Sequence, residues 1–159
     1  TTISNAQDRL TAMVSQDGYL SFRMTLSEFY VHISQSGKIT EFGALASGNI
    51  SYDVNGRVDR IGTTNVSYDV YDRVDRIGST NISYNVSGRV DRIGSTNISY
   101  SVRDKIDRIG SKNVSYNVYD KVDRIGSSNI SYNVYGKVDR ISDSEGFIIF
   151  RKKSAAIDD

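Results

Sequence analysis

The sequence contains no cysteine and no proline, and it has one histidine, His32. Without cysteine there can be no disulfide, thiolate zinc site or cysteine nucleophile, and the redox compartment cannot be inferred. Without proline every backbone N–H is available to a neighbouring strand, which favours a continuous β-ladder. A Ser-His-Asp triad would have to use His32, and no Gly-x-Ser-x-Gly elbow is present. We expect His32 to be a partly exposed packing residue on a strand with Tyr30 and Ser34.

Charge of one sign and long apolar runs are also missing. The net charge is +1, from 20 Lys and Arg against 19 Asp and Glu, and the two signs alternate closely through the repeats. Nucleic acid needs a concentrated basic surface, so we expect no nucleic-acid partner. No apolar run approaches the roughly 20 residues of a membrane-spanning helix, so we expect no membrane span.

Motifs for metals and phosphates are weak. Asp69, Asp72 and Asp75 lie at three-residue intervals, as in some calcium sites, but Arg73 and Arg76 beside them would oppose a dication. We therefore interpret these aspartates as salt-paired or turn-capping. No glycine-rich loop followed by Lys-Ser or Lys-Thr is available for a phosphate. The sequence predicts no catalytic residue, no metal and no other cofactor, and so no enzyme.

The strongest positive feature is a unit of sixteen residues repeated six times within residues 49–145. A fixed period indicates that each unit buries its surface only against its neighbours. We treat the chain as one β-repeat domain, 1–159, with an N-terminal cap containing one degenerate repeat (1–48), the repeats (49–145), and a C-terminal cap strand and tail (146–159). The units begin at Ile50, Val66, Ile82, Ile98, Val114 and Ile130.

Each unit contains two predicted chain reversals. The stretch from Asn85 to Gly88 has the pattern of a type I turn closed by a residue in the left-handed region. Asp replaces this glycine in three units and tolerates the same conformation. The second reversal runs from Gly94 to Asn97, and we expect its asparagine in the left-handed position. That placement would explain the Asn-x-Ser sequons by turn chemistry rather than glycosylation; they begin at Asn49, Asn65, Asn81, Asn85, Asn97, Asn113 and Asn129.

These reversals predict an all-β fold, an antiparallel β-meander of tandem hairpins forming an extended, curled single-layer sheet. If Asn85 pairs with Arg89, then Ile82 faces Arg92, Tyr100 comes to lie opposite Arg92, and ladders of tyrosine and arginine share one face. A β-solenoid is the alternative, because one valine never varies, which suggests burial. These valines are Val54, Val70, Val86, Val102, Val118 and Val134.

An open sheet of this kind needs a cover. Ordering each residue costs about 1 to 2 kcal/mol, whereas a cross-strand pair returns roughly 0.2 to 1 kcal/mol. We therefore expect the sheet to curl on itself, or to pair with a second copy through its tyrosine, isoleucine and valine face.

The flanks differ in composition from the repeats and predict caps. A capping box of Ser4 and Gln7, followed by apolar residues at helical spacing up to Gly18, predicts a short N-terminal helix that covers the first strands. Residues 20–26 alternate as in a half-buried strand, and residues 31–43 resemble a worn copy of the unit. Residues 147–150 predict a last strand, with basic residues after it that protect its edge. The apolar positions of the predicted helix are Ala6, Leu10, Met13 and Val14.

The heptad from Tyr52 to Val58, Tyr-Asp-Val-Asn-Gly-Arg-Val, resembles the Tyr-Asp repeat of bacterial Rhs-type cell-surface proteins, whose core reads Tyr-Asp-x-x-Gly-Arg-Leu. The resemblance implies strand pairs in a spiralling sheet that forms a shell or scaffold, secreted or at the cell surface, without catalysis. This chain has a shorter period, Asp for Gly in half of its units, and too little length to wrap a cargo. The resemblance therefore implies hairpin geometry rather than encapsulation.

The first hypothesis for function is a non-enzymatic repeat scaffold or interaction protein acting through an extended sheet surface. The second is a carbohydrate- or protein-binding module that uses aromatic and cationic rows. The partners expected are a second copy bound through the sheet face, a glycan or a protein. A hydrolase would require two carboxyl groups roughly 5 to 9.5 Å apart in one pocket. The candidate ligand face comprises Tyr71, Tyr119, Tyr135, Arg76, Arg92 and Arg124.

Overall fold

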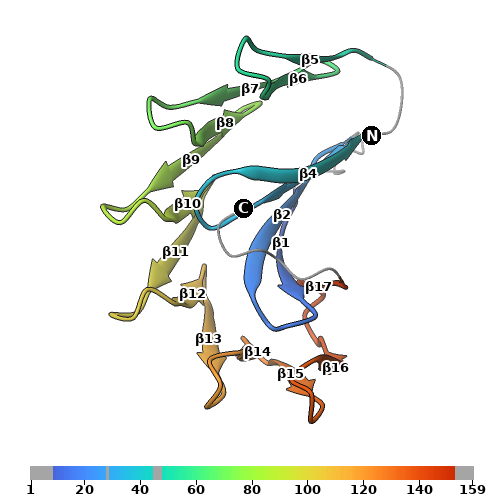
Figure 1. Ribbon diagram of the computed structural model, residues 1–159, viewed down its shortest axis with the longest axis vertical. Helices are drawn as coiled ribbons and strands as arrows, with labels where there is room; N and C mark the ends of the chain where they lie inside the picture. Colours follow the sequence, from blue (N-terminus) through green and yellow to red (C-terminus); the bar gives the residue numbers. More distant parts are fainter. Residues whose placement is uncertain (1–8, 28, 45–47, 153–159) are drawn as a thin grey trace.

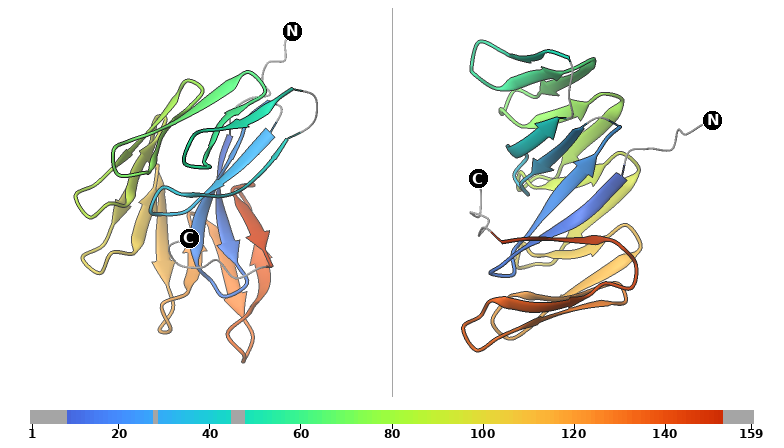
Figure 2. Two further views of the ribbon diagram at one scale, coloured as in Figure 1. Left: turned by 45° about the horizontal axis from the view of Figure 1, so that its top comes forward. Right: turned by 90° about the vertical axis from the view of Figure 1, so that its right-hand side faces the viewer.

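The computed structural model describes residues 9–27, 29–44 and 48–152, and it consists of two β-sheets (Figure 1). A twelve-stranded sheet, here called the repeat sheet, has the order β16-β15-β14-β13-β12-β11-β10-β9-β8-β7-β6-β5. A five-stranded sheet, here called the inner sheet, has the order β17-β1-β2-β3-β4. The repeat sheet curves as an arc, and the inner sheet lies on its concave side (Figures 1 and 2). The described residues contain no helix.

The inner sheet is built from both flanks of the chain. The first four strands run antiparallel to their neighbours, and the C-terminal strand pairs parallel with β1. The predicted strands at residues 20–26 and 147–150 are confirmed. The bounds are β1 (Arg9–Ser15), β2 (Leu20–Thr25), β3 (Phe29–Ile33), β4 (Ile39–Ala44) and β17 (Ile148–Arg151).

The predicted N-terminal helix is wrong for the described residues, because β1 occupies Arg9–Ser15. This strand is paired on both edges and buried from residue 11 to residue 15 on both faces. A strand buried on both faces lacks the alternation that identifies strands in a sequence, so Leu10, Met13 and Val14 have helical spacing by coincidence. Gly18, the predicted helix stop, instead lies in the β1–β2 turn with φ 87°. The capping-box residues and Ala6 lie outside the described residues.

Each repeat unit contributes two antiparallel strands, so the predicted meander is confirmed and the parallel coils of a solenoid are not formed. The first strands of the units are β5 (Ile50–Tyr52), β7 (Thr64–Tyr68), β9 (Thr80–Tyr84), β11 (Thr96–Tyr100), β13 (Lys112–Tyr116) and β15 (Ser128–Tyr132). The second strands are β6 (Val58–Ile61), β8 (Val74–Ile77), β10 (Val90–Ile93), β12 (Ile106–Ile109), β14 (Val122–Ile125) and β16 (Val138–Ser142).

The first reversal of each unit has the predicted geometry. The Asn85 N–H donates to the Arg89 carbonyl at 2.9 Å, and the Gly88 N–H donates to the Asn85 carbonyl at 2.9 Å. Gly88 has φ 84°, in the left-handed region. In the units that lack this glycine, Asp72, Asp104 and Asp120 take φ between 65° and 70°.

Replacing Asp120 by glycine is expected to stabilise the protein by about 0.5 kcal/mol, because glycine adopts positive φ without a steric penalty. The ion pair that is lost, with Arg103 at 3.2 Å, is exposed and contributes little. Replacing Asp120 by valine is instead expected to lower the free energy of unfolding by about 1 to 2 kcal/mol. Urea unfolding of both variants measures the difference; equal midpoints would contradict the assigned backbone conformation.

The second reversal uses glycine, not asparagine, as its left-handed residue. Gly94 has φ 61°, and Ile93 pairs with Thr96 across a two-residue turn typical of type II′ hairpins. Asn97, predicted in the left-handed position, is an exposed residue of β11. A left-handed conformation therefore does not explain the six asparagines at this position. Asn85, by contrast, does cap its turn, since its Oδ1 accepts from the N–H groups of Ser87 and Arg89. In the sixth unit Ser142 replaces this glycine, and the chain leaves the repeat sheet for β17.

The predicted register is right at the turn and wrong beyond it. Tyr84 pairs with Val90 as expected, but a β-bulge between Val90 and Arg92 shifts the register by one residue. Ile82 consequently faces Ile93 rather than Arg92, and Arg92 lies opposite Ser83. The extra residue of the bulge lets valine and isoleucine of the second strand both face inward although they are three positions apart.

The same shift separates arginine from tyrosine. Arg92 pairs with Asn97 on its other side, so the predicted position of Tyr100 opposite Arg92 is wrong. Arg92 and its equivalents are exposed on the convex face, whereas five strand tyrosines are half-buried against the core: Tyr68, Tyr84, Tyr100, Tyr116 and Tyr132. The predicted shared ladder of tyrosine and arginine on one face is not formed.

The inner sheet covers the concave face of the repeat sheet. Phe22, Val31 and Ile33 of the inner sheet belong to one apolar cluster with the inward valines and isoleucines of the units, and these three are 0% exposed. The prediction of a single-layer sheet is therefore wrong, and so is the prediction that the sheet covers itself or pairs with a second copy through this face. The chain's own flanks provide the second layer.

Candidate functional site

The turns of the inner sheet accept hydrogen bonds from the backbone of the repeat units. At the bulge, the ninth residue of a unit turns its N–H away from its hairpin partner and toward the inner sheet. Four units have such a bond: Val74 donates to the Gly37 carbonyl at 3.0 Å, Val90 to Gln35 at 2.8 Å, Val122 to Gly18 at 3.3 Å, and Val138 to Gln16 at 2.9 Å.

The carbonyl of the same ninth residue accepts a tyrosine hydroxyl from the next unit. The Tyr68 hydroxyl donates to the Val58 carbonyl at 2.6 Å, and the Tyr100 hydroxyl donates to the Val90 carbonyl at 2.6 Å. Tyr84, Tyr116 and Tyr132 make the equivalent bond. Burial raises the pKa of Tyr68 to about 12 and also raises the pKa of the other four tyrosines, which keeps them protonated as donors.

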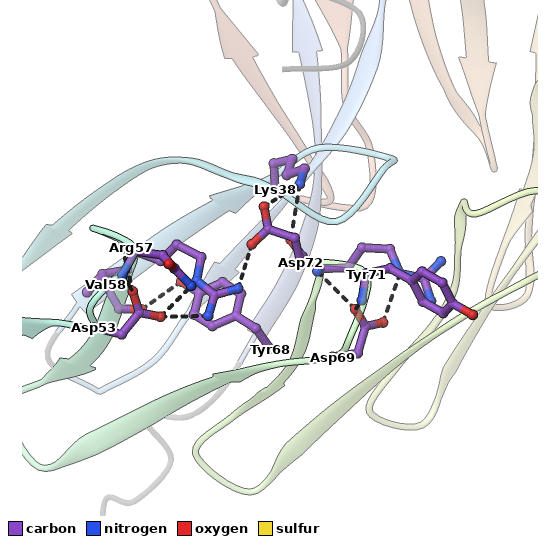
Figure 3. Close-up of polar contacts among 10 residues, drawn as sticks. Lys38, Asp53, Arg57, Val58, Tyr68, Asp69, Tyr71 and Asp72 are labelled. Carbon is purple, nitrogen blue, oxygen red and sulfur yellow. Dashed lines mark hydrogen bonds and ion pairs between the residues drawn. The ribbon is translucent and has the colours of Figure 1, made fainter.

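A charged network ties the first units together beside these tyrosines (Figure 3). The Asp53 carboxylate accepts from the backbone N–H of Arg57 at 3.0 Å and from its Nε at 2.8 Å. The Arg57 guanidinium lies 4.1 Å from the Tyr68 ring centroid and also pairs with Asp72. Lys38 of the inner sheet lies 3.2 Å from Asp72, and hydrogen bonds from Arg57 and Lys38 lower the pKa of the Asp72 carboxyl. Asp72 and Asp69 are salt-paired as expected, and Asp69 also caps its turn. Asp75 instead accepts a hydrogen bond from the Ser67 hydroxyl.

The hairpin turns of the six units lie side by side along one edge of the repeat sheet (Figure 1). We call this edge the hairpin rim; it comprises residues 53–56, 69–72, 85–88, 101–104, 117–120 and 133–136. The unvarying valine sits at the tip of each turn and is between 88% and 108% exposed. The expectation that its constancy reflects burial is wrong.

Two of the predicted ligand-face tyrosines share a groove on the rim. Tyr119 and Tyr135 line a groove of about 690 Å³ between the last two hairpins, and both are exposed. Asn117, Lys121 and Asp123 add polar groups to the lining. The groove thus combines exposed aromatic rings with amide, ammonium and carboxylate groups, a combination suited to a polar ring such as a sugar.

The remaining predicted residues lie elsewhere. Tyr71 is exposed on the rim near the other end of the arc, where the Arg73 guanidinium lies 4.9 Å from its ring centroid. Arg76, Arg92 and Arg124 lie on the convex face, and each donates its Nε to the carbonyl of the following turn glycine at 2.8 to 3.0 Å. The structure therefore brings together two of the six predicted residues.

A second cleft, of about 230 Å³, opens between the sheets at the fourth unit. Ile106, the ninth residue of this unit, lines the cleft, and among the described residues no inner-sheet carbonyl accepts its N–H. Four cationic and two acidic side chains surround it, so its charge suits an anionic group. Sequence reasoning did not identify this cleft, because its lining comes from distant elements: Arg89, Arg103, Asp104, Lys105, Asp120 and Arg151.

His32 is buried, at 6% exposure, so the expected partial exposure is wrong. Its Nδ1 lies 3.1 Å from Glu41 Oε1, its ring lies beside Tyr30, and burial lowers its pKa. Among the described residues no three His, Cys, Asp or Glu side chains are grouped to hold a metal ion. No helix in the described part of the chain is long and apolar enough to cross a membrane.

No protein-family model matches this sequence, and a comparison with curated proteins finds no relative. The resemblance to Tyr-Asp repeats therefore depends on the heptad residues alone.

Proposed function

We propose that this protein is a non-enzymatic repeat scaffold that holds a partner protein along its hairpin rim. The observation that carries the proposal is the valine at the tip of all six hairpins, which is unvarying and almost fully exposed. An exposed apolar residue at every tip contributes nothing to the core, and six of them in one row along the rim form a repeated apolar surface that suits contact with a partner. The likeness to Tyr-Asp repeats supports a secreted or cell-surface setting.

A triple variant, Val86→Ser, Val102→Ser and Val118→Ser, tests this function. We expect its free energy of unfolding to remain within about 0.5 kcal/mol of the wild type, because the three side chains are exposed. We expect it to lose a partner that the wild type binds, measured by affinity capture followed by titration of the purified partner. A matched variant on the convex face, Arg76→Ser with Arg92→Ser, should keep binding. A partner bound equally by both variants would contradict the proposal.

The groove at Tyr119 and Tyr135 favours a second candidate function, a carbohydrate-binding module. We expect Tyr119→Ala to weaken glycan binding by about two- to tenfold, because a stacked ring contributes roughly 0.5 to 1.5 kcal/mol beyond its buried area. Tyr71→Ala is the matched control, since Tyr71 occupies the same turn position outside the groove. A glycan array followed by titration measures both. No glycan bound, or equal loss in both variants, removes this candidate.

A further inference from the structure

The two ends of the repeat sheet lack contacts that every internal junction between units makes. At an internal junction, the first residue of a unit is buried against the preceding unit. Its exposure is between 3% and 7% at Val66, Ile82, Ile98, Val114 and Ile130. The equivalent residue of the first unit, Ile50, has no preceding unit and is 43% exposed.

The tyrosine hydrogen bond is likewise unmade at both ends. Tyr52 corresponds to the tyrosines that donate to the preceding unit, yet it is 57% exposed and its hydroxyl has no partner among the described residues. At the other end, the Val138 carbonyl corresponds to the acceptors of these bonds, and no described residue donates to it. One end therefore presents the donor and the other presents the acceptor.

The apolar surfaces of the two ends match in the same way. Val138 and Ile141 in β16 are partly exposed, whereas their equivalents Val122 and Ile125 in β14 are 0% and 1% exposed. They correspond to the side of an internal junction that packs against the first strand of the next unit. Ile50 and Tyr52 are the missing counterpart, and both belong to β5, the opposite edge strand of the same sheet.

We propose that copies of this chain assemble head to tail, with β5 of one copy adding to β16 of another and continuing the repeat sheet. The strand directions agree, since every first strand of a unit runs antiparallel to the second strand of the unit before it. By analogy with the internal junctions, the Tyr52 hydroxyl of one copy donates to the Val138 carbonyl of the copy before it. Ile50 packs against Ile141 of that same preceding copy.

The geometry favours this mode over face-to-face pairing, because the apolar concave face is already covered by the inner sheet. Unpaired edge strands with apolar side chains are templates for addition of another strand. A contact between two different surfaces does not close after two copies, so the assembly grows as an open chain or a large ring.

Sedimentation velocity across a concentration series tests the proposal. The wild type is expected to exceed the 17.7 kDa of one chain increasingly as concentration rises, with no limiting dimer. Ile50→Lys, which places a charge on the head edge, is expected to remain one chain at every concentration. Tyr52→Phe, which removes only the hydroxyl, is expected to weaken association about three- to tenfold. Ser95→Lys is the matched control, because Ser95 is exposed in the turn between the internal strands β10 and β11, outside the rim and both edge strands, and it should assemble like the wild type.

A mixing experiment separates head-to-tail assembly from any symmetric contact. The Ile50→Lys chain keeps an intact β16, so it should bind the free β5 at one end of a wild-type assembly. Its own β5 cannot bind a further copy, so the assemblies should become shorter as the fraction of variant chains rises. Circular dichroism checks that each variant is folded. A wild type that stays at one chain, a wild type that stops at two, or an Ile50→Lys chain that fails to shorten the assemblies would each overturn the proposal.

Discussion

Replacing Gly37 by alanine is expected to lower the free energy of unfolding by about 3 to 4 kcal/mol. Gly37 has φ 90°, where an L side chain costs about 1 to 2 kcal/mol. An added Cβ would also lie 2.6 Å from Cε2 of Tyr84, and overpacking of this kind costs typically 1 to 3 kcal/mol. The ring cannot easily move aside, because its hydroxyl is bonded to the Val74 carbonyl. Guanidinium unfolding followed by circular dichroism measures the loss.

Gly56 provides the matched control for this substitution. It has φ 83°, but an added Cβ would meet no atom within 4 Å. Gly56→Ala should therefore show only the backbone penalty of about 1 to 2 kcal/mol. The difference between the two variants isolates the close approach of the β3–β4 turn to the repeat tyrosine. If both variants lost the same stability, the inner turn would not be docked where the structure places it.

The protein is expected to unfold cooperatively as the pH rises above about 10. Burial raises the pKa of Tyr68 to about 12, and it raises the pKa of Tyr84, Tyr100, Tyr116 and Tyr132 as well. Below the unfolded-state value of about 10, both states keep these protons and stability is at its full value. Above it the unfolded chain releases protons that the folded state retains, so stability falls with rising pH up to the raised values. After allowance for solvent screening, the ionisation of each of these partly exposed tyrosines lowers the free energy of unfolding by about 1 to 2 kcal/mol. The five contributions act together.

Tyrosinate absorbance and circular dichroism, followed together in an alkaline titration, measure this transition. The ionisation of the buried tyrosines should coincide with loss of the fold. Tyr100→Phe provides a control that should be less stable at neutral pH and less sensitive to high pH. Its free energy of unfolding at neutral pH should be lower by about 1 to 2 kcal/mol, because the Val90 carbonyl loses its donor. Its stability should then fall less steeply above pH 10, since one titrating group has gone. Ionisation of all the tyrosines well before unfolding would contradict the buried hydroxyl bonds.

The hairpins were predictable because their chemistry is local. The requirement for positive φ at Gly88, Asp72 and their equivalents follows from the turn itself, and a fixed period repeats the inference in every unit. The second reversal was placed correctly in the chain, but its left-handed residue was predicted to be Asn97 rather than Gly94. Both residues tolerate positive φ, and only the pairing of Ile93 with Thr96 decides between them.

The register and the second layer could not be predicted in the same way. The bulge at Asp91 has no residue signature in the sequence, yet it moves Ile82 from Arg92 to Ile93 and sends the arginine to the convex face. The strand β1 was mistaken for a helix because it is buried on both faces between β17 and β2, a contact between the two ends of the chain. Neither feature follows from residues that are close in sequence.

The candidate groove shows the same limit. Tyr119 and Tyr135 were predicted as members of an aromatic row, and their place in adjacent hairpin turns brings them together. The arginines proposed alongside them point to the convex face because of the unrecognised bulge, and they lie beside the second reversal rather than at the rim. The polar partners Asn117 and Asp123 are joined to the groove only by the packing of adjacent hairpins.

The central claim is that carbonyls of the inner-sheet turns bind the backbone of the repeat units and so join flanks and repeats in one two-layer structure. NMR measurement of scalar coupling through hydrogen bonds tests it directly. The amide nitrogens of Val74, Val90, Val122 and Val138 should couple to the carbonyl carbons of Gly37, Gln35, Gly18 and Gln16, and their amide protons should exchange slowly with solvent. Absence of these couplings, with rapid exchange at the four amides, would contradict the account.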